Sequence, residues 1–435
     1  RGGAPDPARP AGGRLRRAPV MATLRVFVND RPVEIARGAT VWDAVRERDR
    51  GLAAMIESGA AYVTDGVGRT LDPGDAVREA GEVYRVVVTA RRGPPRLTKE
   101  QLRRWPKAEL HVHLDGALRP ATMLELARDQ GVRLPADTPE ALAQAMLVRD
   151  ARSLEEYLEK YTITLSVLQT AAALERVAYE FVHDVAAENV RYVEVRYSPL
   201  LHRPALTLAQ AIEAPLAGIT RAVAETGTKV GVIVCGIRTL PAEQSLELAR
   251  AAADYCTAGV VAFDLAGAER GHPAREHRAA FEYAAAHGMA CTCHAGEGNG
   301  PDSIHQALHE CGAQRIGHGT RLGEDPELLA RVIERRIPLE MCISSNVHTH
   351  TVAAATEHPF RRYLEDGVVV TLNTDGRLTD GVSLTDEYHL AHAALGLSKE
   401  QLARVALNAY ESAFLPDYEK VALISRVQSE LEALG

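Results

Sequence analysis

The sequence predicts an α/β protein in which a small α+β domain precedes a (β/α)8 TIM barrel. Eight strand-like apolar runs follow residue 97, and longer helix-like stretches separate them, as in a parallel α/β fold. Eight is also the number of strands that closes a TIM barrel. Most runs start apolar and end in His, Asp, Glu, Ser or Asn, and barrel enzymes place their active sites at that end of the strands. In chain order the runs are "AELHVHLD", "RYVEVRYSP", "KVGVIVCGI", "GVVAFDLAG", "MACTCHAGE", "RIGHGT", "IPLEMCISSN" and "VVVTLNTDG".

The chain divides into three parts of different composition. Residues 1–20 are almost entirely Arg, Pro, Ala and Gly; because such a segment cannot bury enough apolar surface to fold, this leader is expected to be disordered or not native. Met21 resembles a natural start. Residues 21–90 alternate short strands with a helix, and residues 97–435 hold the barrel pattern. With 435 residues, 46% of them hydrophobic, the chain can bury a substantial core in more than one domain.

The segment 21–90 has the order hairpin, helix, strands. "LRVFVN" and "VEIA" flank a turn at Asn29–Pro32, "TVWDAVRER" is typical of a short helix, and "YVTD" and "VYRVVVT" are strand-like. This order resembles the β-grasp domains of ubiquitin-like sulfur carriers. Those carriers need a free C-terminal Gly-Gly, whereas this segment continues through "ARRGPPRL" into the next domain. We therefore expect an accessory or interaction domain and not a sulfur carrier.

Charge and composition exclude several classes of function. A net charge of −8 argues against a nucleic-acid surface, which needs clustered Lys and Arg, and favours a small-molecule substrate. The sequence has no apolar run of the roughly 18 residues that span a membrane and no secretory signal at its start. Six scattered cysteines form no disulfide framework. These observations predict a cytoplasmic protein that does not bind membranes, and they do not predict its oligomeric state.

Two histidines and an aspartate alternate along the first barrel run, "ELHVHLDG". Because strand side chains alternate between faces, His111, His113 and Asp115 should point the same way. Imidazole suits zinc, but an H-x-H pair by itself is about as often structural as metal-binding. His294 ends the fifth run and Asp375 ends the eighth. With these two, four ligands can converge at the barrel mouth from strands one, five and eight, which favours a zinc site.

Two more polar groups follow the strands. Glu297 lies three residues after His294, close enough to reach a water at the metal without binding the metal, where a carboxylate can transfer protons. His318 ends the sixth run and should face the same cavity; the alternative is a buried, hydrogen-bonded structural histidine. His348 and His350 follow the seventh run closely enough to line the mouth, and the sequence does not decide their role.

Longer motifs span most of the barrel: "PKAELHVHLDGAL", "YEFVHDVAAENVRYVEVRYSP", "VVAFDLAGAE", "HAGE", "RIGHGT" and "TLNTDG" followed by "LTDEY". In this order and spacing they resemble the adenosine deaminase family over about residues 105–418. By this resemblance Glu297 would protonate the purine N1, and His318 would orient the attacking hydroxide. The resemblance also implies the zinc ligands, which are His111, His113, His294 and Asp375.

The same resemblance implies how a substrate would bind. The backbone of Gly267 would meet the purine N3, and Asp115 would hydrogen-bond the sugar, which favours a purine nucleoside over free adenine. The helix "SLEEYLEKYTITL" matches the apolar lid of the family, and core packing explains its apolar stripe equally well. The stripe consists of Leu154, Tyr157, Leu158 and Tyr161.

The implied reaction is the zinc-dependent hydrolytic deamination of adenosine or 2′-deoxyadenosine to inosine or 2′-deoxyinosine, with release of ammonia. One zinc ion per chain is expected, because "VVAFDLAG" lacks the lysine with which two-metal relatives bridge their metals. Gly376 stands where the family usually has an aspartate that contacts the purine N7. Arg377 or Asp380 could supply that contact. Two other hypotheses are a deaminase of a modified 6-aminopurine nucleoside and a binding or regulatory barrel without turnover.

Overall fold

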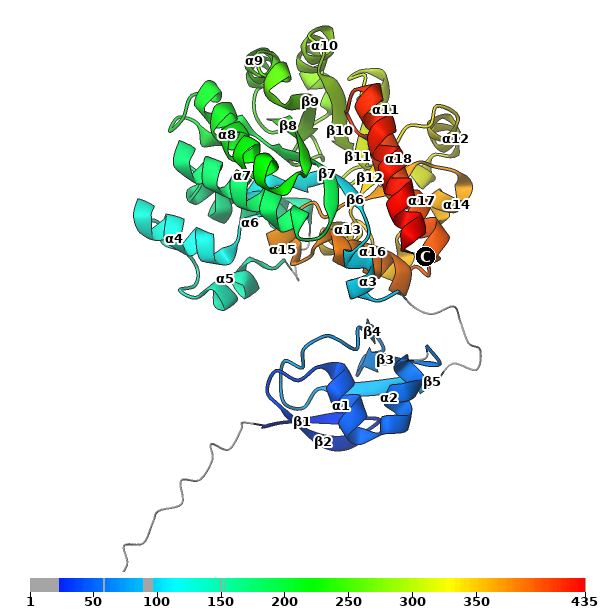
Figure 1. Cartoon of the computed structure of the whole chain (residues 1–435). Helices are drawn as coiled ribbons and strands as arrows, with labels where there is room; N and C mark the ends of the chain where they lie inside the picture. Colours follow the sequence, from blue (N-terminus) through cyan, green and yellow to red (C-terminus); the bar gives the residue numbers. More distant parts are fainter. Residues whose placement is uncertain (1–22, 58, 89–96, 149–150, 152, 435) are drawn as a thin grey trace, which may run out of the picture. The chain divides into compact units, whose positions relative to one another are not determined.

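The computed structural model describes residues 23–57, 59–88, 97–148, 151 and 153–434. The leader predicted over residues 1–20 lies outside the described residues. The chain forms two compact units, one ending at Arg96 and the other starting at Leu97 (Figure 1). Each unit has its own buried apolar core, so each is stabilised by its own packing.

The first unit is a small α+β domain built on a five-stranded sheet. Its elements are β1 (Thr23–Val28), β2 (Arg31–Ala36), α1 (Val41–Arg48), α2 (Arg50–Glu57), β3 (Ala61–Asp65), β4 (Thr70–Leu71) and β5 (Val83–Val88). The strand order is β2-β1-β5-β3-β4; β1 and β5 are parallel, and the other neighbours are antiparallel. The predicted hairpin, helix and later strands are present, whereas α2 is an element that the sequence pattern does not predict.

Local sequence explains the hairpin and the first helix of this unit. Asn29 and Asp30 both adopt positive φ (49° and 60°), as a two-residue hairpin turn requires, and Asn and Asp tolerate this conformation. Thr40 caps α1, because its hydroxyl accepts from the backbone N–H of Asp43 while the Asp43 carboxylate accepts from the Thr40 N–H. Along β1 the side chains alternate between exposed and buried, which places its apolar residues on the core face.

The second unit is the predicted (β/α)8 barrel. Its strands are β6 (Lys107–His113), β7 (Val190–Tyr197), β8 (Lys229–Ile237), β9 (Val260–Ala266), β10 (Ala290–Ala295), β11 (Arg315–His318), β12 (Leu339–Met341) and β13 (Val370–Leu372). Consecutive strands pair in parallel from β6 to β13. A parallel bridge between Val112 and Asp375 joins the segment after the last strand to the first strand. All eight predicted strands and the barrel are confirmed.

Helices surround the barrel strands (Figure 1). They are α3 (Lys99–Arg103), α4 (Pro120–Gln130), α5 (Pro139–Met146), α6 (Leu154–Ser166), α7 (Ala171–Ala186), α8 (Leu208–Thr226), α9 (Ala242–Ala253), α10 (Arg278–Ala286), α11 (Pro301–His309), α12 (Pro326–Glu334), α13 (Ile343–His348), α14 (Phe360–Asp366), α15 (Arg377–Asp380), α16 (Leu384–Ala393), α17 (Lys399–Ser412) and α18 (Asp417–Ala433). Ser or Thr side chains cap the start of α6, α7, α8, α16 and α17. The helices α7 and α8 approach closely at Gly218, where a Cβ would lie 2.1 Å from the carbonyl oxygen of Glu175.

A buried network of charges connects strands across the inside of the barrel. Arg196 on β7 donates from Nη1 to Oδ2 of Asp264 on β9 (2.9 Å) and from Nη2 to Oε2 of Glu340 on β12 (2.7 Å). Arg315 on β11 donates from Nε to Oε1 of Glu340 (2.7 Å) and also pairs with Glu194 on β7. All five side chains are buried. Because a buried charge is very costly without a partner, these contacts hold the strands that carry them in place.

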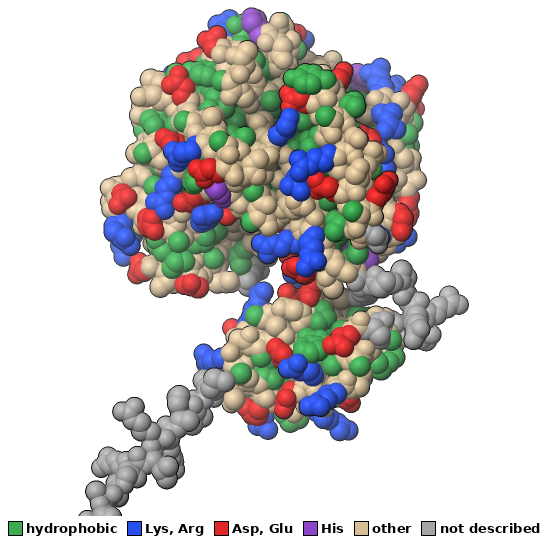
Figure 2. Space-filling model, viewed as in Figure 1, with side chains coloured by type: hydrophobic (Ala, Val, Ile, Leu, Met, Phe, Trp, Pro, Cys, Tyr) green, Lys and Arg blue, Asp and Glu red, His purple; other side chains and the backbone are tan. Residues whose placement is uncertain are grey.

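No helix among the described residues is both long and apolar enough to cross a lipid bilayer. Figure 2 shows acidic and basic side chains interspersed over the visible face of the barrel unit. This mixture agrees with the modest net charge of −8 and gives that face no strong field of a single sign.

Removing the central cation of the buried network should destabilise the barrel strongly. We expect Arg196→Met to lower the free energy of unfolding by about 3–5 kcal/mol, because Asp264 and Glu340 lose their shared cation while remaining buried. Urea unfolding of the full chain, followed by circular dichroism, measures the change. The control Arg221→Met breaks an exposed ion pair with Glu175 and should cost under about 1 kcal/mol. Equal losses in the two variants would contradict the importance of the network.

Candidate active site

A cavity of about 370 Å³ opens at the carboxyl ends of the barrel strands. The predicted site residues that line it are His113, Asp115, Leu154, Tyr157, Leu158, Tyr161, Gly267, His294, Glu297, His318 and Asp375. His111 is fully buried and joins the group through its contact with Asp375. The fold therefore brings together residues that are more than 250 positions apart in the sequence, with numbers from 111 to 375.

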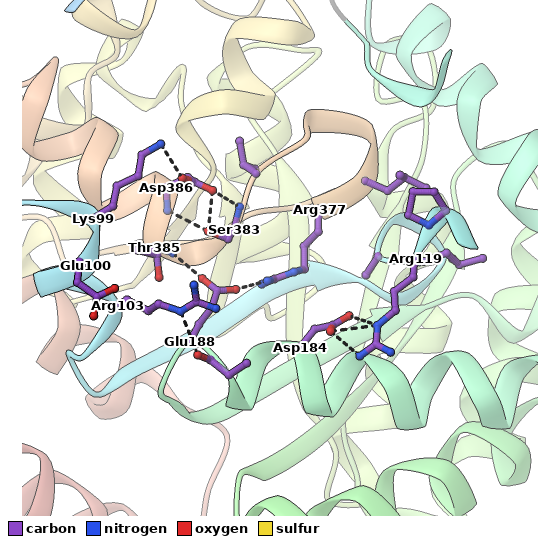
Figure 3. Close-up of a pocket in the computed structure, with 16 residues that line it drawn as sticks. Lys99, Glu100, Arg103, Arg119, Asp184, Glu188, Arg377, Ser383, Thr385 and Asp386 are labelled. Atoms are coloured by element: carbon purple, nitrogen blue, oxygen red, sulfur yellow. Dashed lines mark hydrogen bonds and ion pairs between the residues drawn. The ribbon is translucent and has the colours of Figure 1, made fainter. Parts of the chain in front are cut away.

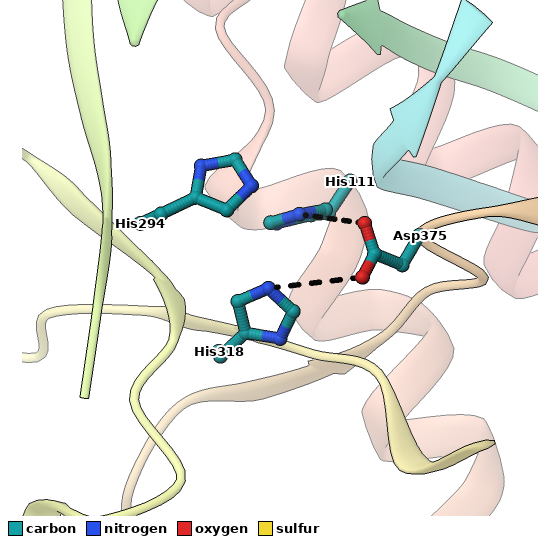
Figure 4. A group of neighbouring side chains, drawn as sticks. All are labelled: His111, His294, His318 and Asp375. Atoms are coloured by element: carbon teal, nitrogen blue, oxygen red, sulfur yellow. Dashed lines mark ion pairs between the residues drawn. The ribbon is translucent and has the colours of Figure 1, made fainter. Parts of the chain in front are cut away.

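Side chains from β6, β10 and β11 converge on Asp375, which follows β13 (Figure 4). Nε2 of His111 lies 3.5 Å and Nε2 of His113 lies 3.3 Å from Oδ1 of Asp375. Nε2 of His113 lies 3.1 Å from Nε2 of His294. His318 stands beside this group, with Nε2 at 3.8 Å from Oδ2 of Asp375. Donor atoms of four side chains, His111, His294, His318 and Asp375, all lie within 4.8 Å of one another.

The donor set fits a zinc ion. Nε2 of His111 is buried and has no hydrogen-bond partner among the described residues. An unpaired buried nitrogen destabilises the fold unless a bound ligand, such as a metal ion, interacts with it. Burial lowers the pKa of His113 and of His294, so both imidazoles are neutral, as metal ligands must be. Burial opposes ionisation of Asp375, but His111 and His318 beside it hold the pKa of its carboxyl well below the usual range. Imidazole nitrogens together with a carboxylate are ligands that zinc accepts.

Two carboxylates behind the histidines orient the imidazole rings. Oε2 of Glu340 lies 3.0 Å from Nδ1 of His111, and Oδ2 of Asp264 lies 2.9 Å from Nδ1 of His294. Metal-binding histidines commonly use their second nitrogen in this way, which fixes the ring and leaves the other nitrogen free for the metal. The sequence reasoning missed both carboxylates. Their only signal is a charged residue inside an apolar strand, as in "VVAFDLAG" and "IPLEM".

Two residues of the group adopt left-handed backbone conformations. His318 has φ 62° and Asp375 has φ 60°, and such conformations cost about 1–3 kcal/mol in a residue that has a side chain. Ser345 holds Asp375 by donating from Oγ to Oδ2 (2.7 Å), and the N–H of His113 donates to the Asp375 carbonyl (2.8 Å). Strain of this kind persists where surrounding contacts over-determine a site.

Glu297 enters the cavity from the loop after β10. Glu269 holds this loop, because its carboxylate accepts from the backbone N–H of Glu297 and from two neighbouring N–H groups, at 2.7–3.0 Å. Oε1 of Glu297 is buried without a hydrogen-bond partner, and Oε2 lies 3.5 Å from Nε2 of His318. Burial raises the pKa of Glu297 well above its usual range, and the charge of Asp375 adds to the shift. This shift favours the protonated form of the carboxyl group, which can donate a proton.

Crowding explains the glycine at position 376. A Cβ there would lie 2.0 Å from Oγ1 of Thr379, 2.8 Å from the hydroxyl of Tyr157 and 2.9 Å from the hydroxyl of Tyr161. The hydroxyl of Tyr157 and Oγ1 of Thr379 are 2.9 Å apart and hydrogen-bonded. Gly376 has φ −113°, which any residue can adopt. Lack of space, and not backbone conformation, therefore excludes a larger residue.

Neither Arg377 nor Asp380 lines this cavity, although the sequence offers both as substitutes for an aspartate at position 376. Oδ1 of Asp380 lies 2.7 Å from Nδ1 of His348. Arg377 pairs with Glu188, and both line a separate cavity of about 550 Å³ (Figure 3). His348 and His350, whose role the sequence leaves undecided, do not line the active-site cavity.

Curated relatives match the barrel unit closely. The model of the adenosine deaminase family matches residues 106–430. The chain is 42% identical to the adenosine deaminase of Mycobacterium leprae over 345 residues, which are 75% of this chain and 95% of that protein. It is 38% identical to the probable adenosine deaminase of Dictyostelium discoideum over 322 residues, which are 73% of this chain and 42% of that protein. The family match lies in the second unit, so the role of the first unit stays a prediction.

Solved structures share the barrel. An adenine deaminase from Arthrobacter aurescens superposes with a TM-score of 0.69 at 27% identity, covering 75% of this chain and 99% of that one. An Arabidopsis N6-mAMP deaminase superposes with a TM-score of 0.67 at 29% identity, covering 76% of this chain and 99% of that one. The chain therefore belongs to the adenosine deaminase family, and it is a hydrolase that acts on a purine C–N bond.

Proposed function

We propose that the protein catalyses the zinc-dependent hydrolytic deamination of adenosine and 2′-deoxyadenosine. The reaction consumes one water and yields ammonia and inosine or 2′-deoxyinosine. The observation that carries the proposal is the convergence of four ligand side chains with Glu297 and His318 at one cavity. Adenosine deaminases that are 42% identical over most of their length support adenosine as the substrate.

The lining of the cavity favours a nucleoside over a nucleotide. The described residues that line it include no Lys or Arg, and four of them, Asp115, Glu155, Glu297 and Asp375, carry carboxyl groups. Among these described lining residues, a 5′-phosphate would therefore meet no cation. The volume of about 370 Å³ lies near the lower end for small-molecule sites, which suits a nucleoside. One solved relative is named as a deaminase of N6-mAMP, a nucleotide, and that substrate does not suit this lining.

A single zinc ion per chain would be held by His111, His113, His294 and Asp375. Zinc bound there would supply Lewis acidity, which makes hydroxide available near neutral pH. The 6-amino carbon is a poor electrophile because of its amide-like resonance, so the ring must also be protonated. The chain's own residues supply that second requirement.

Glu297 and His318 would act on the reacting end of the base. Glu297, whose protonated form is favoured by burial, would donate to the purine N1 and so draw electrons away from C6. His318 would hydrogen-bond the attacking oxygen. Oδ1 of Asp115 is buried without a partner and would accept from a sugar hydroxyl, while the N–H of Gly267 would donate to N3. The residues of α6 that would cover the base are Leu154, Tyr157, Leu158 and Tyr161.

A second candidate substrate is a modified 6-aminopurine nucleoside. Gly376 favours it, because the position carries no side chain for the purine N7 and the hydroxyls of Tyr157 and Tyr161 fill the space instead. The same zinc ligands and proton donor would serve that substrate. A binding or regulatory barrel without turnover is the third hypothesis, and the presence of Glu297 and His318 beside the ligands argues against it.

Replacing Glu297 with Gln should stop turnover and leave the metal bound. Glutamine cannot donate a proton to N1, so kcat for adenosine should fall by at least about 100-fold, whereas zinc content should stay at one per chain. Loss of absorbance in the adenosine band measures turnover, and plasma mass spectrometry measures zinc.

The control for this experiment is Glu324→Gln, at an exposed residue that pairs with Arg321; it should retain full activity. Undiminished turnover in Glu297→Gln would contradict the role of Glu297. A zinc-loaded wild type that leaves adenosine unchanged would exclude adenosine and direct the search to modified 6-aminopurine nucleosides.

Removing the ligand carboxylate should remove the metal. We expect Asp375→Asn to hold well under one zinc per chain after dialysis, because the amide carries no charge to bind a divalent cation. Chelation of the wild type should abolish activity, and added zinc should restore it. Asp366→Asn, at an exposed carboxylate paired with Arg362, is the matched control. Full zinc content in Asp375→Asn would show that the ion is held elsewhere.

Placing the aspartate that is usual in the family at position 376 should lower activity. A Cβ at this position would lie 2.0 Å from Oγ1 of Thr379, so the loop after β13 must shift, and kcat/KM for adenosine should fall by roughly tenfold or more. The double variant Gly376→Asp with Thr379→Ala removes the nearest atom and should recover part of the loss. A rise in kcat/KM for Gly376→Asp alone would show that the crowding is not a constraint.

A further inference from the structure

A series of buried hydrogen bonds leads from a backbone N–H group to the ring of His318. The N–H of Phe360 donates to Nδ1 of His358 (3.2 Å), and Nε2 of His358 lies 3.0 Å from Oδ1 of Asn346. Nδ2 of Asn346 lies 3.0 Å from Nδ1 of His318. The side chains have almost no exposure: the exposed fractions are 4% for His358, 0% for Asn346 and 1% for His318. Bulk water therefore does not compete for these bonds.

The backbone N–H sets the direction of the first two bonds. An N–H group of the backbone can only donate, so Nδ1 of His358 is an acceptor. A neutral imidazole carries a single N–H, and burial lowers the pKa of His358 to about 3. Its one proton is therefore on Nε2 and points at Asn346. This bond needs an acceptor, which fixes the amide of Asn346 with Oδ1 toward His358.

The amide then sets the proton on His318. With Oδ1 of Asn346 facing His358, the NH2 group faces His318 and donates to Nδ1. The hydroxyl of Thr320 is compatible with this orientation and donates to the same Oδ1 (2.7 Å). An imidazole nitrogen that accepts a hydrogen bond carries no proton, so the ring has its single N–H on the other nitrogen. Since Nδ1 accepts, the N–H of His318 lies on Nε2.

We propose that Asn346 and His358 are positioning residues that fix His318 as the Nε2–H tautomer, so that His318 donates a hydrogen bond into the cavity and cannot take up a proton there. The role of His318 itself rests on the proposed function. Its Nε2 lies 3.5 Å from Oε2 of Glu297 and 3.8 Å from Oδ2 of Asp375. A fixed donor at this place stabilises negative charge on the attacking oxygen and is not the base of the reaction.

The tautomer can be read directly by NMR. The full chain, loaded with zinc and labelled with 15N in its histidines, is compared with His318→Gln to assign the two ring nitrogens of His318. We expect a protonated-type shift at Nε2 and an unprotonated-type shift at Nδ1. The opposite pattern would overturn the inference. Because this readout needs no turnover, it still decides the tautomer if the wild type fails to deaminate adenosine and the proposed function falls.

Substitution of Asn346 should reverse the tautomer. Asn346→Asp is nearly isosteric, but its carboxylate can only accept, so Nδ1 of His318 should become protonated in the same spectrum. With the donor at Nε2 no longer enforced, kcat for adenosine should fall about 100-fold with a smaller change in KM. An unchanged His318 spectrum in Asn346→Asp would overturn the inference.

Two variants of His358 separate positioning from packing. In His358→Leu the side-chain oxygen of Asn346 keeps only the Thr320 hydroxyl as a partner. Because a hydroxyl can donate or accept, the Asn346 amide can then rotate, and kcat for adenosine should fall roughly tenfold. His358→Gln places an amide N–H where Nε2–H stood and should restore most of kcat. Equal losses in His358→Leu and His358→Gln, with the His318 spectrum unchanged in both, would show a merely structural role.

Discussion

The guanidinium of Arg196 lies between Asp264 and Glu340, and the proposed metal site depends on that arrangement. The carboxylate oxygens that contact Arg196 also contact the histidines: Oδ2 of Asp264 lies 2.9 Å from Nδ1 of His294, and Oε2 of Glu340 lies 3.0 Å from Nδ1 of His111. One buried cation therefore fixes two carboxylates, and each carboxylate orients one histidine. Buried ion pairs seldom stabilise a fold better than apolar packing would. The network is better explained as the support that turns both imidazoles toward a common point.

The cavity above this network collects polar atoms that no described residue of the chain satisfies with a hydrogen bond. Nε2 of His111, Oδ1 of Asp115 and Oε1 of Glu297 are buried without hydrogen-bond partners, and His318 and Asp375 carry left-handed backbone conformations. Unpaired buried groups and strained residues concentrate at functional sites, where a ligand can satisfy what the fold leaves unpaired. The contacts from Glu340 and Asp264 and the bonds through His358 and Asn346 leave the rings of His111, His294 and His318 little freedom before any ligand arrives. Such preorganisation suits a reaction that depends on stabilising a developing charge.

Short apolar runs separated by helix-like stretches were enough to predict the eight strands and the polar residues at their ends, because such runs are local features of the sequence. The histidines proposed as ligands were therefore identifiable from runs such as "ELHVHLDG" and "CTCHAG". Their partners were not, since Glu340 contacts His111 across 229 positions and no local pattern reports such a contact. Gly376 is crowded by Oγ1 of Thr379 and also by two tyrosine hydroxyls that α6 brings against it, and no local pattern reports the contact with α6. Proximity in the sequence suggested Arg377 as a substitute for the N7 contact, because Arg377 directly follows Gly376. In the structure Arg377 pairs with Glu188 and lines another cavity.

Hydrolytic deamination can be tested most directly by following the oxygen atom that enters the product. Adenosine is incubated with zinc-loaded protein in water enriched in oxygen-18, and the products are analysed by mass spectrometry with a parallel ammonia assay. Attack of water at C6 predicts inosine that carries one oxygen-18 atom in the base and an equal amount of ammonia. Adenine with free ribose, inosine without the label, or unchanged adenosine would contradict the proposed reaction.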